Sequence, residues 1–180
     1  MSSWSLQFLS YIVVTSLVAC SERSTQPPPS APPAPAVAAL VLGAEPQGAI
    51  GIAAAKAKGP TDAITVTGRV AGTVKGFAVF TLMDLGIPYC GETNKEDKCP
   101  TPWDYCCESK ETRSANALLV EARGADGKPL PTPSLGLLPV DRVAVTGKLT
   151  KDEHGNFVLL ATGWFRQERP QLPSYVRWPL

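Results

Sequence analysis

Histidine is almost absent from this chain, which has one histidine in 180 residues. A metal site built from several histidines of one chain is therefore excluded, and His154 is the single candidate for histidine-based catalysis. It stands beside Gly155 in an expected hairpin turn, where a solvated side chain is the ordinary state. Gly-x-Ser-x-Gly, His-Glu-x-x-His and phosphate-binding glycine loops are also lacking. We expect no catalytic residue, no cofactor and no enzyme.

Charge is scarce and evenly balanced. Charged residues make up 18% of the chain, and 17 basic against 16 acidic side chains give a formal net charge of +1. Within residues 63–166, twelve basic and twelve acidic side chains cancel. A protein that binds single-stranded nucleic acid needs a basic groove with stacking aromatic side chains. The composition therefore predicts no nucleic-acid partner.

The first nineteen residues carry no charged side chain and are mostly apolar from Leu6 onward. This run is shorter than the about 20 apolar residues of a membrane-spanning helix and is typical of a signal peptide. It ends in Leu17-Val18-Ala19-Cys20-Ser21, which resembles the lipobox of bacterial lipoproteins. The resemblance implies cleavage before Cys20, acylation of its sulfur, and sorting to the periplasmic face of the outer membrane. The membrane is thus an expected partner, through a lipid anchor.

Proline and alanine dominate the next part of the chain. Six of the sixteen residues in 21–36 are proline, which favours extended, polyproline-like backbone. An Ala- and Gly-rich stretch without strand alternation follows. We therefore expect four parts, which are a signal peptide (1–19), a lipid-anchored, disordered linker (20–60), a folded domain (61–166) and a tail rich in proline and aromatic residues (167–180).

The folded domain shows five segments whose apolar residues alternate as in strands, at 63–70, 76–84, 116–123, 141–149 and 156–165. The first and fourth share the pattern apolar-x-Val-Thr-Gly-basic-aliphatic, and a glycine inside a strand marks a bulge or a close approach. This order of strands and glycines resembles an oligonucleotide/oligosaccharide-binding (OB) barrel. We expect a mainly β fold, a small five-stranded OB-like barrel, with a long insertion between the second and third strands.

The insertion, Leu85–Ser114, contains the other four cysteines of the chain, at positions 90, 99, 106 and 107. In an oxidising compartment an even number of cysteines predicts disulfides. Adjacent cysteines in an extended chain point in opposite directions, so we expect Cys106 and Cys107 each to pair with one of Cys90 and Cys99. A thiolate site for zinc or copper is the alternative, although zinc ligands usually come in pairs two to four residues apart. Redox chemistry is a third alternative, but no Cys-x-x-Cys supports it.

The string from Cys99 to Glu108 is similar to a cysteine-rich loop of uncharacterised bacterial lipoproteins, a resemblance that implies no activity. Trp103, Asp104 and Tyr105 in this string form a possible binding loop, because binding residues concentrate on loops held by a rigid scaffold. The other interpretation is that the two aromatic rings form a small core within the loop. The sequence leaves both open.

The sequence as a whole favours a non-catalytic, lipid-anchored binding or scaffolding module of the cell envelope. The expected binding partner of this module is an envelope protein or a glycan. In this leading interpretation no residue coordinates a metal. The alternatives are an envelope protein that binds zinc or copper through thiolates and, second, an OB-type nucleic-acid binder, since a fold by itself does not determine a function.

Overall fold

A computed structural model describes residues 31–178 of the chain. The expected signal peptide and Cys20 lie outside the described residues. No helix within 31–178 is long and apolar enough to cross a membrane. The elements follow one another as α1 (Pro35–Ala38), α2 (Ile52–Lys58), β1 (Thr61–Thr73), β2 (Val79–Met83), η1 (Pro102–Asp104), α3 (Lys110–Asn116), β3 (Ala117–Glu121), β4 (Arg142–Lys151) and β5 (Phe157–Glu168).

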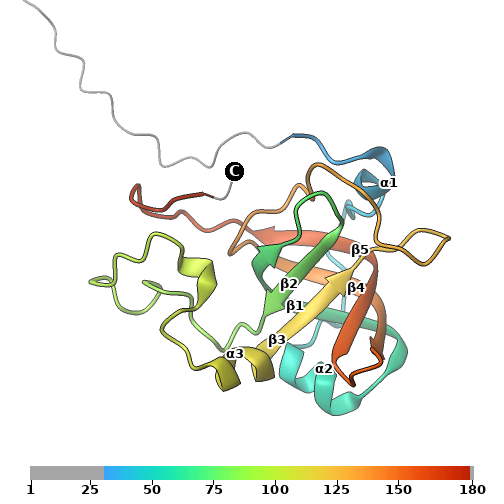
Figure 1. The fold of residues 1–180 in the computed structure, drawn as a ribbon, viewed down its shortest axis with the longest axis horizontal. Coiled ribbons are helices and arrows are strands. Elements are labelled where there is room, and N and C mark those ends of the chain that lie inside the picture. Colours follow the sequence, from blue (N-terminus) through green and yellow to red (C-terminus); the bar gives the residue numbers. More distant parts are fainter. Residues whose placement is uncertain (1–30, 179–180) are drawn as a thin grey trace, which may run out of the picture.

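The five strands close into one barrel in the order β1-β2-β3-β5-β4 (Figure 1). Neighbouring strands are antiparallel except β3 and β5, which run parallel. β1 is long because one part of it pairs with β4 and its last residues pair with β2. The mainly β fold and the small five-stranded barrel are confirmed, and the barrel fits the OB-like architecture.

The two glycines of the repeated pattern lie where strands approach each other closely. A Cβ at Gly147 would overlap the carbonyl oxygen of Leu160, and the β4–β5 register shifts at that glycine. A Cβ at Gly68 would lie 2.8 Å from the carbonyl oxygen of Met83. Both positions therefore need glycine for space, as the sequence predicts for a bulge or a close approach.

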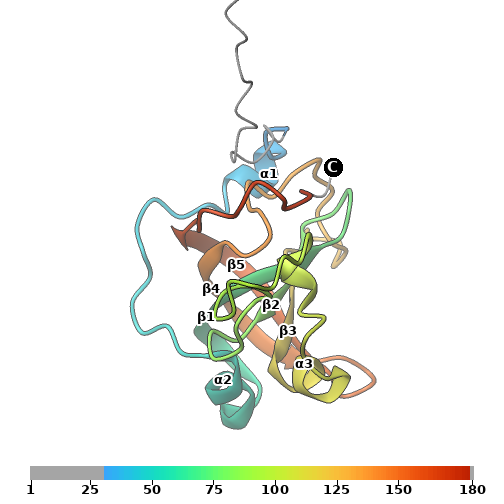
Figure 2. The same ribbon diagram turned by 90° about the vertical axis from the view of Figure 1, so that its left-hand side faces the viewer.

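The folded part begins near Ala34, and the expected linker boundary at residue 60 is corrected. Val37, Ile52 and Ala55 are completely buried in the same core as the barrel strands. Leu42 donates to the carbonyl of Trp164 on β5, and Ile50 bridges to β1. In Figure 2, α2 lies at one end of the barrel and α1 at the other. The alternation rule missed this segment because its apolar side chains cover barrel ends instead of forming a strand.

The insertion and the tail lie together outside the barrel. Residues 84–116 connect β2 to β3 beside the barrel, and the tail after β5 passes over them (Figure 1). Leu172 and Val176 of the tail pack with Trp103 of the insertion and with Val140. Arg169 begins this path with a double hydrogen bond to the completely buried Asp141, at 2.8 and 2.6 Å. The tail is thus part of the fold.

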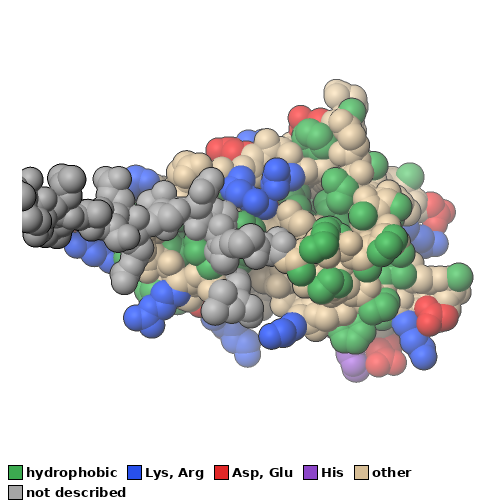
Figure 3. Space-filling model, turned by 90° about the horizontal axis from the view of Figure 1, so that it is seen from above, with side chains coloured by type: hydrophobic (Ala, Val, Ile, Leu, Met, Phe, Trp, Pro, Cys, Tyr) green, Lys and Arg blue, Asp and Glu red, His purple; other side chains and the backbone are tan. Residues whose placement is uncertain are grey.

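Charged side chains do not form a single patch on the face seen in Figure 3. That view shows basic side chains at separated points around a group of hydrophobic side chains. The exposed large hydrophobic side chains among the described residues are Val41, Val74, Phe77 and Tyr175. This distribution agrees with the balanced charge of the sequence.

Candidate functional site

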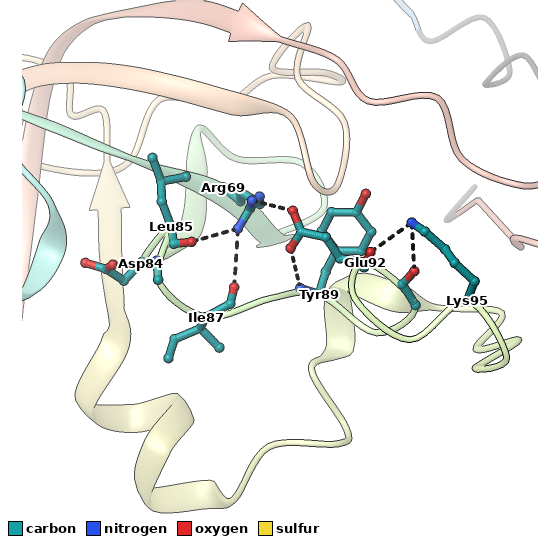
Figure 4. Close-up of polar contacts among 9 residues, drawn as sticks. Arg69, Asp84, Leu85, Ile87, Tyr89, Glu92 and Lys95 are labelled. Carbon is teal, nitrogen blue, oxygen red and sulfur yellow. Dashed lines mark hydrogen bonds and ion pairs between the residues drawn. The ribbon is translucent and has the colours of Figure 1, made fainter.

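Arg69 of β1 attaches the start of the insertion to the barrel (Figure 4). Its Nη1 donates to the carbonyl oxygens of Leu85 and Ile87 at 3.2 and 3.3 Å, and its Nη2 pairs with Oε1 of Glu92 at 2.6 Å. The other carboxylate oxygen of Glu92 accepts from the backbone N–H of Tyr89, whose ring lies 5.5 Å from the guanidinium carbon. The chain just before Cys90 is therefore held by Arg69 of the barrel and by Glu92 of the insertion.

The two aromatic side chains of the possible binding loop lie inside it. Trp103 is 7% exposed and Tyr105 is 1% exposed, whereas Asp104 between them is exposed. The Trp103 ring stacks on Trp178 of the tail with centroids 5.7 Å apart. Both rings are buried, but Trp103 belongs to a small core that the loop shares with the tail and Val140, so the core is not formed within the loop alone.

Tyr105 has an unusual backbone and an unsatisfied hydroxyl. Its φ of 49° lies in the left-handed region, which costs a non-glycine residue about 1–3 kcal/mol and persists only where the surrounding structure enforces it. Its buried hydroxyl has no hydrogen-bond partner, and burial raises the pKa of this phenol. Strain of this kind concentrates at functional sites, and here it lies directly before Cys106.

Cys106 and Cys107 occupy a tight turn and not an extended segment. The turn is closed by the N–H of Glu108, which donates to the carbonyl oxygen of Tyr105 at 3.0 Å. The expectation that adjacent cysteines point in opposite directions applies to a strand and does not hold here. Instead, the Sγ atoms of Cys90, Cys106 and Cys107 all lie within 4.8 Å of one another.

Three of the four sulfur atoms converge, and none of the four is bonded to another. The Sγ of Cys106 lies 3.6 Å from that of Cys90 and 3.8 Å from that of Cys99. A disulfide has a bond of about 2.05 Å, and all four cysteines of the described residues are free thiols. Cys90 is buried, Cys99 is half-buried, and Cys106 and Cys107 are exposed. The expected disulfides are not seen in the structure and stay a prediction.

Hydrogen bonds within the cluster shift the pKa values of its thiols in different directions. Burial acts to raise the pKa of Cys90, but hydrogen bonds from the Cys107 backbone and from the thiols of Cys106 and Cys107 outweigh it, and the net shift is downward. The hydrogen bond with Cys90 raises the pKa of Cys106 to about 11. The hydrogen bonds with Cys90 and Asp97 raise that of Cys107 to about 12. Cys90 is therefore the first of these three thiols to lose its proton.

Asp97 links Cys99 to the cluster, because its carboxylate contacts both Cys99 and Cys107. Its Oδ2 accepts from the Cys107 thiol at 3.4 Å, and its Oδ1 accepts from the backbone N–H of Cys99 at 3.1 Å. On the other side, the N–H of Cys90 donates to the carbonyl oxygen of Pro102 at 3.2 Å. Asp97 and Arg69 are supporting residues that sequence reasoning missed, because their type and spacing carry no signal without the path of the loop.

The described chain has two other candidate sites, an open cavity on the barrel wall and the turn that contains His154. A cavity of about 460 Å³ on the wall formed by β1 and β4 is lined by Lys58, Asp62 and the threonines Thr65, Thr146 and Thr162, together with small and apolar residues. It is widely open, and none of the cysteines lines it. His154 lies in the β4–β5 turn with three quarters of its side chain exposed, and its ring faces only Glu153, at 3.5 Å.

The fold and the site define a small β-barrel protein that carries a cluster of thiols on an inserted loop. The chain matches no family model, no curated protein and no solved structure. The function is therefore argued from the geometry of the cluster.

Proposed function

We propose that this chain is a lipid-anchored protein of the cell envelope that binds a soft metal ion through the thiolates of its cysteine-rich loop. The observation that carries the proposal is the mutual proximity, within 4.8 Å, of the Sγ atoms of Cys90, Cys106 and Cys107. Thiolate sulfur is the ligand that zinc and monovalent copper prefer in proteins. The metal-binding alternative of the sequence therefore takes precedence over the disulfide interpretation.

The distances around Cys106 support a shared ion better than they support separate disulfides. Two disulfides would divide the four sulfurs into two bonded pairs, whereas the sulfurs of Cys90, Cys106 and Cys107 all lie within 4.8 Å of one another, with 3.6 Å between Cys90 and Cys106. Around an ion with metal–sulfur bonds of about 2.3 Å, neighbouring sulfurs of a tetrahedron are about 3.8 Å apart. The spacing in the loop is thus that of ligands around one centre.

The supports of the loop also favour a site that exists before the ion arrives. The ion pair of Arg69 with Glu92 and the stack of Trp103 on Trp178 hold two parts of the loop that carries the sulfurs, near Cys90 and just before Cys106. Ligands that are already placed avoid the loss of conformational entropy on binding. The expected envelope protein or glycan ligand stays a prediction.

Thiol titration and metal analysis test the proposal. The protein is purified from an oxidising compartment without chelators, and its thiols are counted after denaturation in the presence of a chelator, with Cys106→Ser as the comparison. We expect four free thiols besides Cys20 and one bound ion per chain, and no bound ion in the variant. Two disulfides and no metal in the unaltered chain would overturn the proposal.

The anchor needs its own experiment, because Cys20 lies outside the described residues. Growth with a labelled fatty acid should label the unaltered chain and leave Cys20→Ala unlabelled. The altered chain should also leave the membrane fraction. Equal labelling of both chains contradicts acylation at this cysteine without bearing on the metal site.

A further inference from the structure

We propose that the ion is monovalent copper and that three thiolates, those of Cys90, Cys106 and Cys107, are its ligands, with Cys99 outside the coordination sphere. This inference rests on the proposed function and makes it specific. On binding, three Cu–S bonds form and three S–H bonds break, and the protons pass to solvent. No oxidation or reduction is involved, because copper enters as the monovalent ion.

The number of converging sulfurs distinguishes a three-coordinate from a four-coordinate ion. In a tetrahedral four-thiolate zinc site with bonds of about 2.3 Å, all four sulfurs lie about 3.8 Å from one another. Here the sulfurs that are mutually within 4.8 Å are three, and Cys99 is not among them, although its Sγ lies 3.8 Å from that of Cys106. The fourth corner of a tetrahedron is therefore not supplied by Cys99.

Three thiolates are a complete set for monovalent copper and an incomplete one for structural zinc. For bonds of about 2.3 Å, a planar three-coordinate ion has sulfurs about 4.0 Å apart, and structural zinc sites almost always have four protein ligands. Soft thiolates bind monovalent copper as well as zinc, so the number of thiolates, three and not four, is what favours copper here. The 3.6 Å between Cys90 and Cys106 needs only a small expansion to reach this geometry.

The turn at positions 106 and 107 explains how adjacent cysteines serve one ion. The left-handed Tyr105 precedes the turn, and the hydrogen bond from Glu108 to Tyr105 closes it. Cys90 reaches the same point from the segment that Arg69 holds against the barrel. One ligand is buried and two are exposed, so the ion would be reachable from solvent. This exposure suits an ion that is exchanged with a partner more than one that is locked in the fold.

Competition for the metal tests the inference. The reduced full chain is titrated without oxygen with monovalent copper against bicinchoninate, a chromophoric copper chelator, and separately with zinc against a zinc indicator. We expect one copper per chain. Cys90→Ser, Cys106→Ser and Cys107→Ser should each lower the copper affinity more than about 100-fold. A residue that only supports a ligand from the outer shell costs about 10–100-fold when it is changed, so a larger loss indicates a direct ligand. Cys99→Ser is the matched control and should change the affinity less than about threefold.

The outcomes separate the inference from the function on which it rests. Tight zinc binding that needs all four cysteines would overturn the copper assignment and leave a thiolate metal protein. Binding of neither metal would overturn both. X-ray absorption of the copper-loaded unaltered chain supplies a readout that does not depend on whether the variants fold. It should count three sulfur ligands, and two or four would overturn the inference.

Discussion

The guanidinium of Arg69 lies 2.6 Å from the carboxylate of Glu92, and this ion pair joins the barrel to the cysteine-rich loop. Arg69 belongs to β1, whereas Glu92 lies two residues after Cys90 in the insertion. Both side chains are largely shielded, with 17% and 28% exposed. An exposed ion pair contributes about 0–1 kcal/mol, but this one is supported by two backbone carbonyls that accept from the same guanidinium.

Arg69→Lys should loosen the loop while the barrel stays folded. Lysine keeps the charge but has no planar fork, so it cannot reach the two carbonyls and Glu92 together. We expect a loss of about 1.5–3 kcal/mol, the contribution of one hydrogen bond to a charged group. Chemical denaturation measures this loss, and limited proteolysis should cleave the variant faster within residues 85–114. Arg123→Lys is the matched control, because Arg123 also pairs with a glutamate at 2.6 Å, on β3. Equal effects in both variants would contradict the anchoring role.

Trp178→Ala should expose the same loop from the other side. The stack of Trp178 on Trp103 contributes about 0.5–1.5 kcal/mol beyond the burial of area, and both rings cover the loop. We expect faster proteolysis of the insertion and a solvent-exposed emission spectrum from Trp103. Arg177→Ala is the control, since the exposed Arg177 contributes only its backbone N–H, which donates to Pro100. An unchanged proteolysis rate in Trp178→Ala would show that the tail does not support the loop.

Gly147→Ala should destabilise the barrel severely, whereas Gly72→Ala should not. A methyl group at Gly147 would overlap the backbone carbonyl of Leu160, which cannot move without breaking the β4–β5 pairing. A methyl group at Gly72 meets nothing within 4 Å. We expect a loss of about 3 kcal/mol or more for the first variant, above the usual cost of overpacking, and under about 1 kcal/mol for the second. Thermal melts of the two variants check this, and similar melting temperatures would contradict the close approach.

Metal affinity should rise steeply with pH. The raised pKa values of Cys106, about 11, and Cys107, about 12, mean that both thiols are protonated at neutral pH and must each release a proton to become ligands. These two protons alone give an affinity that increases about 100-fold per pH unit, and the slope is steeper where Cys90 must also release its proton, so the affinity is lost as the pH falls. Competition titrations at pH 7 and pH 8 measure the slope, and Cys99→Ser should keep it. An affinity that does not change between the two values would contradict thiol ligation.

The strands were predictable from the sequence, but the packing of the preceding segment, which contains Val37 and Ile52, against the barrel was not. Alternation at Ile64, Val66 and Val70 reports on a strand directly, because side chains of a strand alternate between core and surface. Val37 and Ile52 carry no such local signal, although they are as deeply buried as the strand residues. Their burial depends on chain segments that meet only in the folded protein.

The candidate site shows the same division. The clustering of four cysteines in residues 85–114 marks the loop in the sequence. However, Cys90 and Cys106 are 16 positions apart, and their 3.6 Å separation depends on Arg69, the turn after Tyr105 and the tail. Spacing rules for metal ligands describe local loops, and here the cysteines come together through non-local contacts.

The sequence by itself determined the β class, the five strands, the position of the insertion and the supply of four thiols, because alternation and composition act locally along the chain. Tertiary structure alone decided where the folded part begins, that the aromatic rings of the loop are buried, and which three sulfurs meet. These depend on packing between residues distant in sequence, and the sulfurs of the adjacent Cys106 and Cys107 both lie near that of Cys90 because the fold places the two cysteines in a turn.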